Sequence, residues 1–168
     1  MAGFEVTLYG RFWVTPEGGH MRKLAFLFTA AVAAASAQPR IRLFNPDTLH
    51  KPNGYSHVGE VLSGKIVYIA GQVALDRSGN LVGKDDIRAQ TQQVFENLKA
   101  AIAAAGGDFN DVVKLNYYSV DLLHLPDIRD VRDKFINTRN PPASTAVEVR
   151  RLARPEFLIE VEAVVVVK

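Results

Sequence analysis

Two glutamates near the end of the chain, Glu160 and Glu162, are the first residues whose type and spacing suggest chemistry. They lie in FLIEVEAVVVV (157–167), whose β-branched residues predict a strand. Side chains two apart on a strand share a face, so both carboxylates are expected on one face, together with apolar Leu158 and Val164. A carboxylate on a partly apolar face can orient or deprotonate a water molecule. The alternative is an ion pair at an interface between subunits.

Other catalytic signatures are missing from the sequence. The 168 residues include no cysteine, which excludes thiol nucleophiles, disulfides and thiolate metal sites. There is no G-x-S-x-G motif, no P-loop and no histidine pair at metal-ligand spacing. His57 and Glu60 are three apart, and on the strand expected there they point to opposite faces. The sequence therefore offers no thiolate site and no paired-histidine site for a metal.

Several strands are expected to position these residues. The β-branched and aromatic segments predict strands at 40–45, 56–63, 65–73, 111–122, 144–152 and 157–167. Ser63-Gly64 is a turn signal, so the second and third strands are expected to form a hairpin. A turn around residues 153–156 is expected to join the last two strands.

Two segments change to helical periodicity. Apolar residues recur at spacings of three and four between residues 86 and 105, with Asp85 or Asp86 as the cap and Gly106-Gly107 as the stop. The second helix is expected in LPDIRDVRDKFIN (125–137), where Pro126 suits a first turn. Its apolar stripe consists of Ile128, Val131 and Phe135.

The resulting order, ββαβαββ, predicts an α+β fold with both helices on one face of the sheet. AVVVV (163–167) is apolar on both sides of its strand, which is typical of a strand covered on both faces. Because two helices cover only one face, we expect the other face to pack against further copies of the chain in a homo-oligomer.

The segment MRKLAFLFTAAVAAASAQ (21–38) has the features of an export signal. Two basic residues precede a short apolar run, which ends in Ala35-Ser36-Ala37, the small-x-small pattern that signal peptidase cuts. The run is shorter than the roughly 20 residues that span a bilayer. We therefore expect residues 21–37 to be a signal peptide and residues 1–20 to be an over-called start or a disordered segment. The single domain 38–168 is then exported, periplasmic or secreted, with no membrane contact after cleavage.

The charge balance bears on possible partners. Twenty basic and eighteen acidic residues give a net charge of +2, which provides no general attraction to nucleic acid or to an anionic membrane. Arg150, Arg151 and Arg154 form a small basic cluster, but no stacking aromatics are interleaved with it. We expect a small-molecule partner rather than a nucleic acid.

Five segments resemble the RidA family, also called YjgF. They are GYSH (54–57), VYIAGQV (67–73), the unit from Asp86 to Leu122, PPASTAVEV (141–149) and RPEFLIEVEAV (154–164). The resemblance covers nearly all of residues 40–168, in the right order. It implies a fold similar to chorismate mutase and a homotrimer with clefts between subunits. It also implies hydrolysis of reactive imines or enamines to keto acids and ammonia, without metal or cofactor.

The resemblance also implies site residues. The substrate-facing tyrosine of the family matches Tyr55, which alternatively covers the sheet edge. The family's Ser-Gly-Gln matches Ala70-Gly71-Gln72, so a serine hydroxyl is missing, although Gly71 still lets backbone approach a ligand closely. The family's catalytic carboxylate matches Glu160.

The main departure from the family is a missing arginine. Deaminase members grip the substrate carboxylate with an arginine at the position of Ser144, and many carry cysteine at the position of Ala146. Arg129 matches a substrate-side asparagine, and its alternative role is a solvated helix charge beside Asp133. We therefore expect a RidA-like hydrolase on an imine, an enamine or a related metabolite, but not a standard amino-acid imine deaminase. A binding trimer without turnover and an endoribonuclease-like activity are the alternatives.

Overall fold

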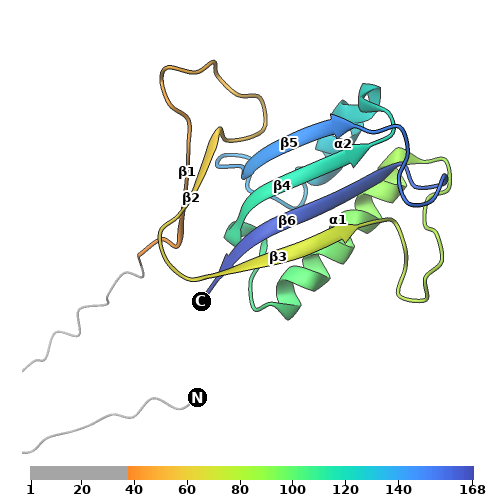
Figure 1. Ribbon diagram of the computed structural model, residues 1–168, viewed down its shortest axis with the longest axis horizontal. Helices are drawn as coiled ribbons and strands as arrows, with labels where there is room; N and C mark the ends of the chain where they lie inside the picture. Colours follow the sequence, from red (N-terminus) through yellow and green to blue (C-terminus); the bar gives the residue numbers. More distant parts are fainter. Residues whose placement is uncertain (1–37) are drawn as a thin grey trace, which may run out of the picture. The chain divides into compact units, whose positions relative to one another are not determined.

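The computed structural model describes residues 38–168, so the expected signal peptide and residues 1–20 lie outside the described residues. The main sheet has four strands in the order β3-β6-β4-β5 (Figure 1). The bounds are Lys65–Gln72 for β3, Ile159–Val167 for β6, Val112–Ser119 for β4 and Ala143–Glu148 for β5. Strand β6 runs antiparallel to β3 and β4, whereas β4 and β5 are parallel.

The central strand β6 has two different faces. Ile159, Val161, Ala163 and Val165 alternate along it and belong to the hydrophobic core. The residues between them, Glu160, Glu162 and Val164, are only half-buried. This alternation confirms that the two glutamates share the face not covered by the helices.

Helix α1 (Ile87–Ala104) packs its apolar side against this sheet. The Asp86 carboxylate accepts hydrogen bonds from the backbone N–H groups of Arg88 and Ala89, as the expected cap. At the other end the N–H of Gly106 donates to Ala103 and that of Gly107 to Ile102. Gly106 has φ +88°, so the helix ends in the left-handed turn that glycine favours.

Helix α2 (Leu125–Arg132) covers the same face as α1, with the short 3-10 helix η2 (Leu122–His124) before it. Ile128 and Val131 are buried as the stripe predicts. Phe135 lies beyond the last turn and packs on Phe95 at a ring distance of 5.3 Å. The second short 3-10 helix, η1 (Phe109–Asp111), leads into β4.

The prediction that the strands at 56–63 and 65–73 form a hairpin is wrong. Strand β2 (Val58–Val61) pairs with β1 (Ile41–Phe44) in a separate two-stranded sheet, and β3 pairs with β6. Val67 and Ile69 of β3 pack on the core, which holds this strand in the main sheet. Gly59 of β2 brings its backbone against Val113, where an added Cβ would lie 2.7 Å from the Val113 carbonyl. Strand β2 therefore packs onto β4 instead of extending the sheet.

The predicted α+β class, with two helices on one face of the main sheet, is confirmed, although the first two strands form a separate sheet. The opposite face carries exposed apolar side chains, among them Tyr68, which is 79% exposed, and Ile66, which is 45% exposed. None of the described helices is long and apolar enough to cross a membrane.

Candidate active site

Glu160 fills a space that only a glycine leaves. A Cβ added at Gly71 would lie 1.9 Å from the Glu160 Oε1 atom. Strand β3 bulges here, since Ile69 pairs with Ala163 and Gln72 with Val161, so two residues of β3 face one residue of β6. The bulge and the missing side chain together set the position of the carboxylate. The sequence predicts both Glu160 and Gly71 as site residues, and the structure places them in contact.

Ala70 is the other residue of the bulge. It is exposed, and its carbonyl accepts a hydrogen bond of 3.0 Å from the Gln72 side chain. Ala70 occupies the position of the family's serine, so a hydroxyl at this position would be exposed next to Gly71. A bulge leaves backbone groups outside the regular ladder, where a ligand can bind them.

The second carboxylate, Glu162, is held by its neighbours. Its Oε1 accepts hydrogen bonds from the Asn116 amide at 2.8 Å and from the Tyr118 hydroxyl at 3.1 Å. The bond to Glu162 raises the pKa of the Tyr118 hydroxyl. Glu160, by contrast, has no hydrogen-bond or ion-pair partner within residues 38–168. Of the two glutamates, Glu160 is therefore the one available to a water molecule or ligand.

Tyr55 lies in the long loop between β1 and β2 and is half-buried. Its hydroxyl is 3.1 Å from Nε2 of His50, and its ring meets His57 edge-on at 5.3 Å. The next residue, Ser56, forms a bridge with Ala143 and donates its hydroxyl to the Pro141 carbonyl. The loop therefore brings Tyr55 to the start of β5.

Ser144 and Ala146 lie on the helix-covered side of the sheet. In the register, Ser144 pairs with Leu115 and Ala146 with Tyr117, both of which are core residues. Glu160 pairs with Tyr118 instead and faces the other way. One chain therefore does not bring Ser144 and Ala146 together with Glu160, because the sheet separates them.

Helix α2 contains an arginine that sequence reasoning missed. Arg132 is buried, at 4% exposed, and both Nε and Nη2 donate to Oδ1 of Asp133, at 2.8 and 2.6 Å. Arg129, the arginine that the resemblance places at the site, is half-buried. Asp133, its expected neighbour, is bound by Arg132. A signal did exist, because Arg132 stands four residues after buried Ile128, within the apolar stripe.

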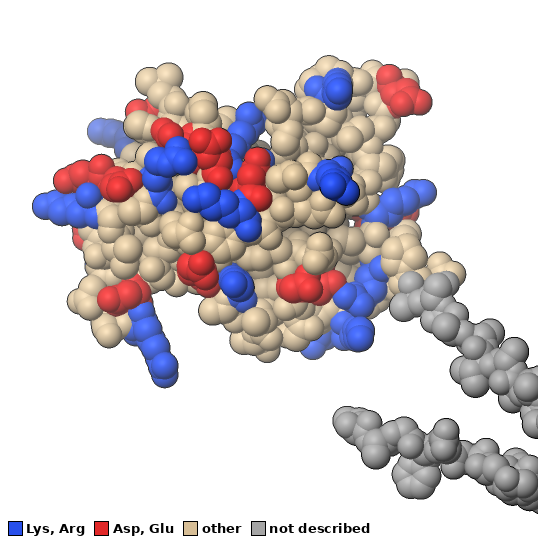
Figure 2. Space-filling view, turned by 180° about the vertical axis from the view of Figure 1, so that it is seen from behind, with Lys and Arg blue, Asp and Glu red and all other residues tan. Residues whose placement is uncertain are grey.

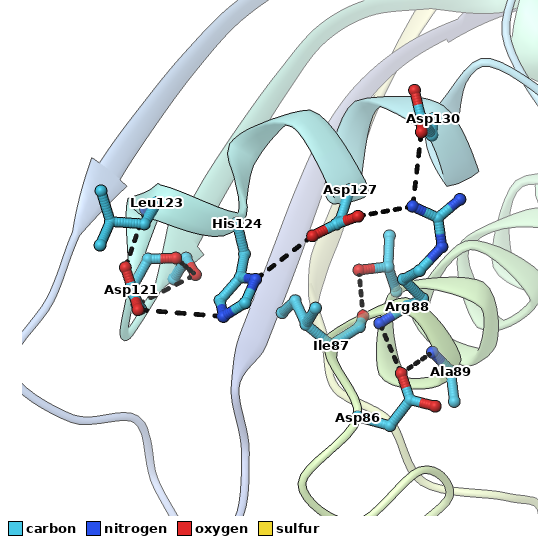
Figure 3. Close-up of polar contacts among 11 residues, drawn as sticks. Asp86, Ile87, Arg88, Ala89, Asp121, Leu123, His124, Asp127 and Asp130 are labelled. Carbon is cyan, nitrogen blue, oxygen red and sulfur yellow. Dashed lines mark hydrogen bonds and ion pairs between the residues drawn. The ribbon is translucent and has the colours of Figure 1, made fainter.

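The charges around the start of α2 form a separate network (Figure 3). Arg88 lies 2.6 Å from Asp127 and 3.4 Å from Asp130, and His124 lies 3.3 Å from Asp127. The Arg88 side chain is the main cause that lowers the pKa of the Asp127 carboxyl. These residues are largely exposed and tie η2 and α2 to the start of α1.

A surface cavity of about 290 Å³ beside this network is lined by Ser119, Asp121 and His124, among others. This trio does not form a catalytic triad. The Ser119 hydroxyl is directed to the backbone carbonyls of Asp121 and Leu158 and not to the imidazole. Across residues 38–168, no group of three His, Asp or Glu side chains is placed to hold a metal ion.

Comparison with known proteins supports the resemblance. Residues 47–167 match the family described as Endoribonuclease L-PSP. A RutC family protein of Pyrococcus horikoshii is 39% identical over 115 residues, covering 68% of this chain and 88% of the relative. A 2-iminobutanoate/2-iminopropanoate deaminase of Dermatophagoides farinae is 32% identical, covering 76% of this chain and 97% of the relative. The crystal structure of a Rid family protein from Yersinia pestis has a TM-score of 0.71 and 41% identity, covering 77% of this chain and all of the other.

Proposed function

Because this chain belongs to the Endoribonuclease L-PSP family, also known as the RidA or YjgF family, we propose that it hydrolyses a small imine or enamine. The observation that carries the proposal is the Glu160 carboxylate, which lies in the space left by Gly71 and has no partner among the described side chains. A relative from Dermatophagoides farinae bears the name of an imine deaminase, which agrees with this chemistry.

The reaction needs a base and a water molecule. Glu160 takes a proton from water, and the resulting hydroxide adds to the carbon of the C=N bond. The nitrogen gains that proton, which gives a carbinolamine. The hydroxyl proton of the carbinolamine then passes to the nitrogen as the C–N bond breaks, and the products are a carbonyl compound and ammonia. An enamine enters the reaction as its imine tautomer, after a proton moves from nitrogen to carbon. Glu162 is held by hydrogen bonds from Asn116 and Tyr118, on the same face of the sheet as Glu160. No cofactor takes part in this scheme.

The site is proposed to be completed by a second chain. Glu160 lies on the uncovered face of the sheet, whereas Tyr55 and Ser144 lie beyond its other side. A homotrimer with this face inward buries Ile66 and Tyr68 and lets a neighbour supply the missing wall. Light scattering of the full chain should give a trimer, and Tyr68→Glu should dissociate it because a charge would enter the interface. A monomeric wild type would contradict the assembly.

A nucleic acid substrate is less consistent with the surface. Figure 2 shows basic and acidic side chains interspersed over the face that it presents, without a large patch of one sign. Arg154 is 3.9 Å from Glu156 and lies over the Phe157 ring, so part of the basic cluster is already engaged. We therefore rank endoribonuclease activity below hydrolysis of a small molecule.

Export is the remaining part of the proposal. It rests on the basic, apolar and small-x-small succession of residues 21–37. Mass spectrometry of the protein from its native host should find an N-terminus at Gln38. Protein retained in the cytoplasm and starting at Met1 would contradict it.

The proposed activity is tested with the full chain and an imine generated in situ by an amino-acid oxidase. Ammonia and keto-acid release should be faster than the spontaneous hydrolysis, and the acceleration should disappear in Glu160→Gln. Ligand-induced changes in melting temperature without any acceleration would contradict hydrolysis and favour a binding trimer.

A further inference from the structure

Arg132 is a buried cation whose partners are incomplete. Its side chain is 5% exposed, and its hydrogen bonds within residues 38–168 go only to one oxygen of Asp133. Asp133 itself is 43% exposed, so the pair is not enclosed. The Nη1 atom of Arg132 forms no hydrogen bond with a described group. It is also not completely shielded from solvent. A buried charge normally has all its donors engaged. The guanidinium thus keeps a donor edge for a ligand.

A second donor without a partner belongs to the same cluster. The Tyr117 hydroxyl is enclosed, and no described atom accepts its hydrogen bond. Burial raises the pKa of Tyr117 to about 12, whereas the charge of Arg132 and its closeness to the hydroxyl act in the opposite direction. The guanidinium therefore lies beside this hydroxyl, although the two do not form a well-aligned hydrogen bond. A buried polar group without a partner in a native protein calls for an explanation such as a ligand, a water or a catalytic role. Arg132 and Tyr117 together therefore form a donor-rich spot that lacks an acceptor.

The loop that carries Tyr55 covers this spot. Gly54 has φ +74°, and a Cβ added there would lie 3.0 Å from Nη2 of Arg132. The guanidinium therefore lies directly against the backbone next to Tyr55. Ser56 bridges Ala143, the residue before Ser144. Tyr55, Ser144 and Arg132 thus share one neighbourhood, although they come from three different elements.

We propose that Arg132 binds the carboxylate of the substrate and supplies from α2 the positive charge that position 144 lacks. This inference rests on the proposed function. What it adds is the binding residue, because the family resemblance already implies imines formed from amino acids, which carry a carboxylate. With Arg132 in this role, the absence of an arginine at position 144 does not exclude an amino-acid imine, contrary to the expectation from the sequence. The planar guanidinium donates from Nη1 to a carboxylate oxygen while Asp133 holds its other edge. Arg132 is then a binding residue, and Glu160 remains the base.

Steady-state kinetics of the full chain separate this role from a structural ion pair. Arg132→Met should raise KM for a carboxylated imine about 10- to 100-fold, as expected when a charge-assisted hydrogen bond is lost. It should leave the hydrolysis of an uncharged imine of similar size within about threefold. The matched control is Arg139→Met, at an exposed position, which should change neither substrate. Equal losses on both substrates, or an effect that appears in Arg129→Met instead, would overturn the proposal.

A rescue experiment adds a readout that a structural role would not give. Ser144→Arg in the Arg132→Met background should recover most of the lost affinity for the carboxylated imine, whereas in the wild-type background it should add little. A gain of the same size in both backgrounds would show that the two arginines do not serve one carboxylate, and would overturn the proposal.

A measurement on the wild type covers the case in which the variants do not fold. Titration with 2-oxobutanoate should shift the side-chain Nε resonance of Arg132 and saturate, whereas 2-butanone should leave it unchanged. An unshifted Arg132 signal at saturating 2-oxobutanoate would refute the inference. This titration needs no turnover, so failure of the proposed hydrolysis and failure of Arg132 binding are distinguishable.

Discussion

Glu160 and Arg132 are the two charged side chains of residues 38–168 on which the proposed function depends, and they lie in opposite surroundings. Glu160 is half-buried on the uncovered face of the sheet, where the bulge of β3 and the absent side chain of Gly71 make room for it. Arg132 is buried on the helix-covered side, beneath the loop at Gly54. The first region is open and the second nearly closed, so one face of the sheet presents an accessible carboxylate and helix α2 on the other face holds a shielded cation.

A single chain does not bring these two regions together. The sheet separates Glu160 from Ser144 and Arg132, so under the proposed function a substrate that contacts both regions lies between two chains. This agrees with the exposed apolar residues of the uncovered face. The two regions are then expected to serve separate tasks, turnover at Glu160 and affinity at Arg132.

The largest effect is expected from the two glutamates compared side by side. Glu160→Gln should lower the rate of imine hydrolysis by about 10²- to 10⁴-fold, because an amide does not take a proton from water. Glu162→Gln is the matched control, and its loss should be at least tenfold smaller, since an amide still accepts from Asn116 or Tyr118. Ammonia release measures both. Equal losses would mean that the contrast between the two carboxylates is wrong.

The next effect concerns the space beside Glu160. Gly71→Ala should push the carboxylate out of position and lower the rate about 10- to 100-fold, because misplacement by about 1 Å costs that much. Circular dichroism should show the fold unchanged. Ala103→Ser, at an exposed position of α1, is the control and should retain the rate. Full activity in Gly71→Ala would show that the position of Glu160 is not set by the glycine.

The Arg132 region should differ in its pH dependence. Burial raises the pKa of Tyr117 to about 12 from about 10 in the unfolded chain, so the folded state favours the neutral hydroxyl. This contribution is complete below pH 10 and is lost as the pH rises from 10 to 12, by at most about 3 kcal/mol. Urea unfolding at pH 9 and pH 11 should show the loss in wild type and a smaller loss in Tyr117→Phe. An equal loss of unfolding free energy between pH 9 and pH 11 in both proteins would show that groups other than Tyr117 cause it.

The smallest effect tests how firmly Glu162 is held. Tyr118→Phe removes its hydrogen bond to Glu162 and should lower the free energy of unfolding slightly at neutral pH. Tyr117→Phe should be neutral or slightly stabilising under the same conditions, since the hydroxyl has no acceptor in the described chain. Thermal melting of both variants checks the contrast. A larger cost for Tyr117→Phe would reveal a partner for its hydroxyl.

The two regions also differ in how far the sequence predicts them. Strand periodicity put Glu160 and Glu162 on one face, and the structure confirms it because a strand allows only two directions for a side chain. The cap at Asp86 and the stop at Gly106 were predictable for a similar reason, since they depend on neighbours in the chain. The pairing of β2 with β1 was not, because a turn signal at Ser63-Gly64 does not say which strand each arm joins.

Arg132 shows a different limit. A charge within a short helix is ordinarily taken as solvated, and its burial depends on Gly54, which is 78 positions earlier in the chain. No local pattern connects these two residues. The bulge at Ala70-Gly71 is similar, because it exists only through the register of β3 against β6.

The division of tasks between the two regions is tested most directly by kinetics of Glu160→Gln and Arg132→Met with one carboxylated imine and its uncharged analogue. Glu160→Gln should lower kcat on both substrates with KM within about threefold. Arg132→Met should raise KM on the carboxylated substrate alone, with kcat retained. If both variants lower kcat together, or if Arg132→Met impairs the uncharged analogue as strongly, the two regions do not divide turnover from affinity and the account is contradicted.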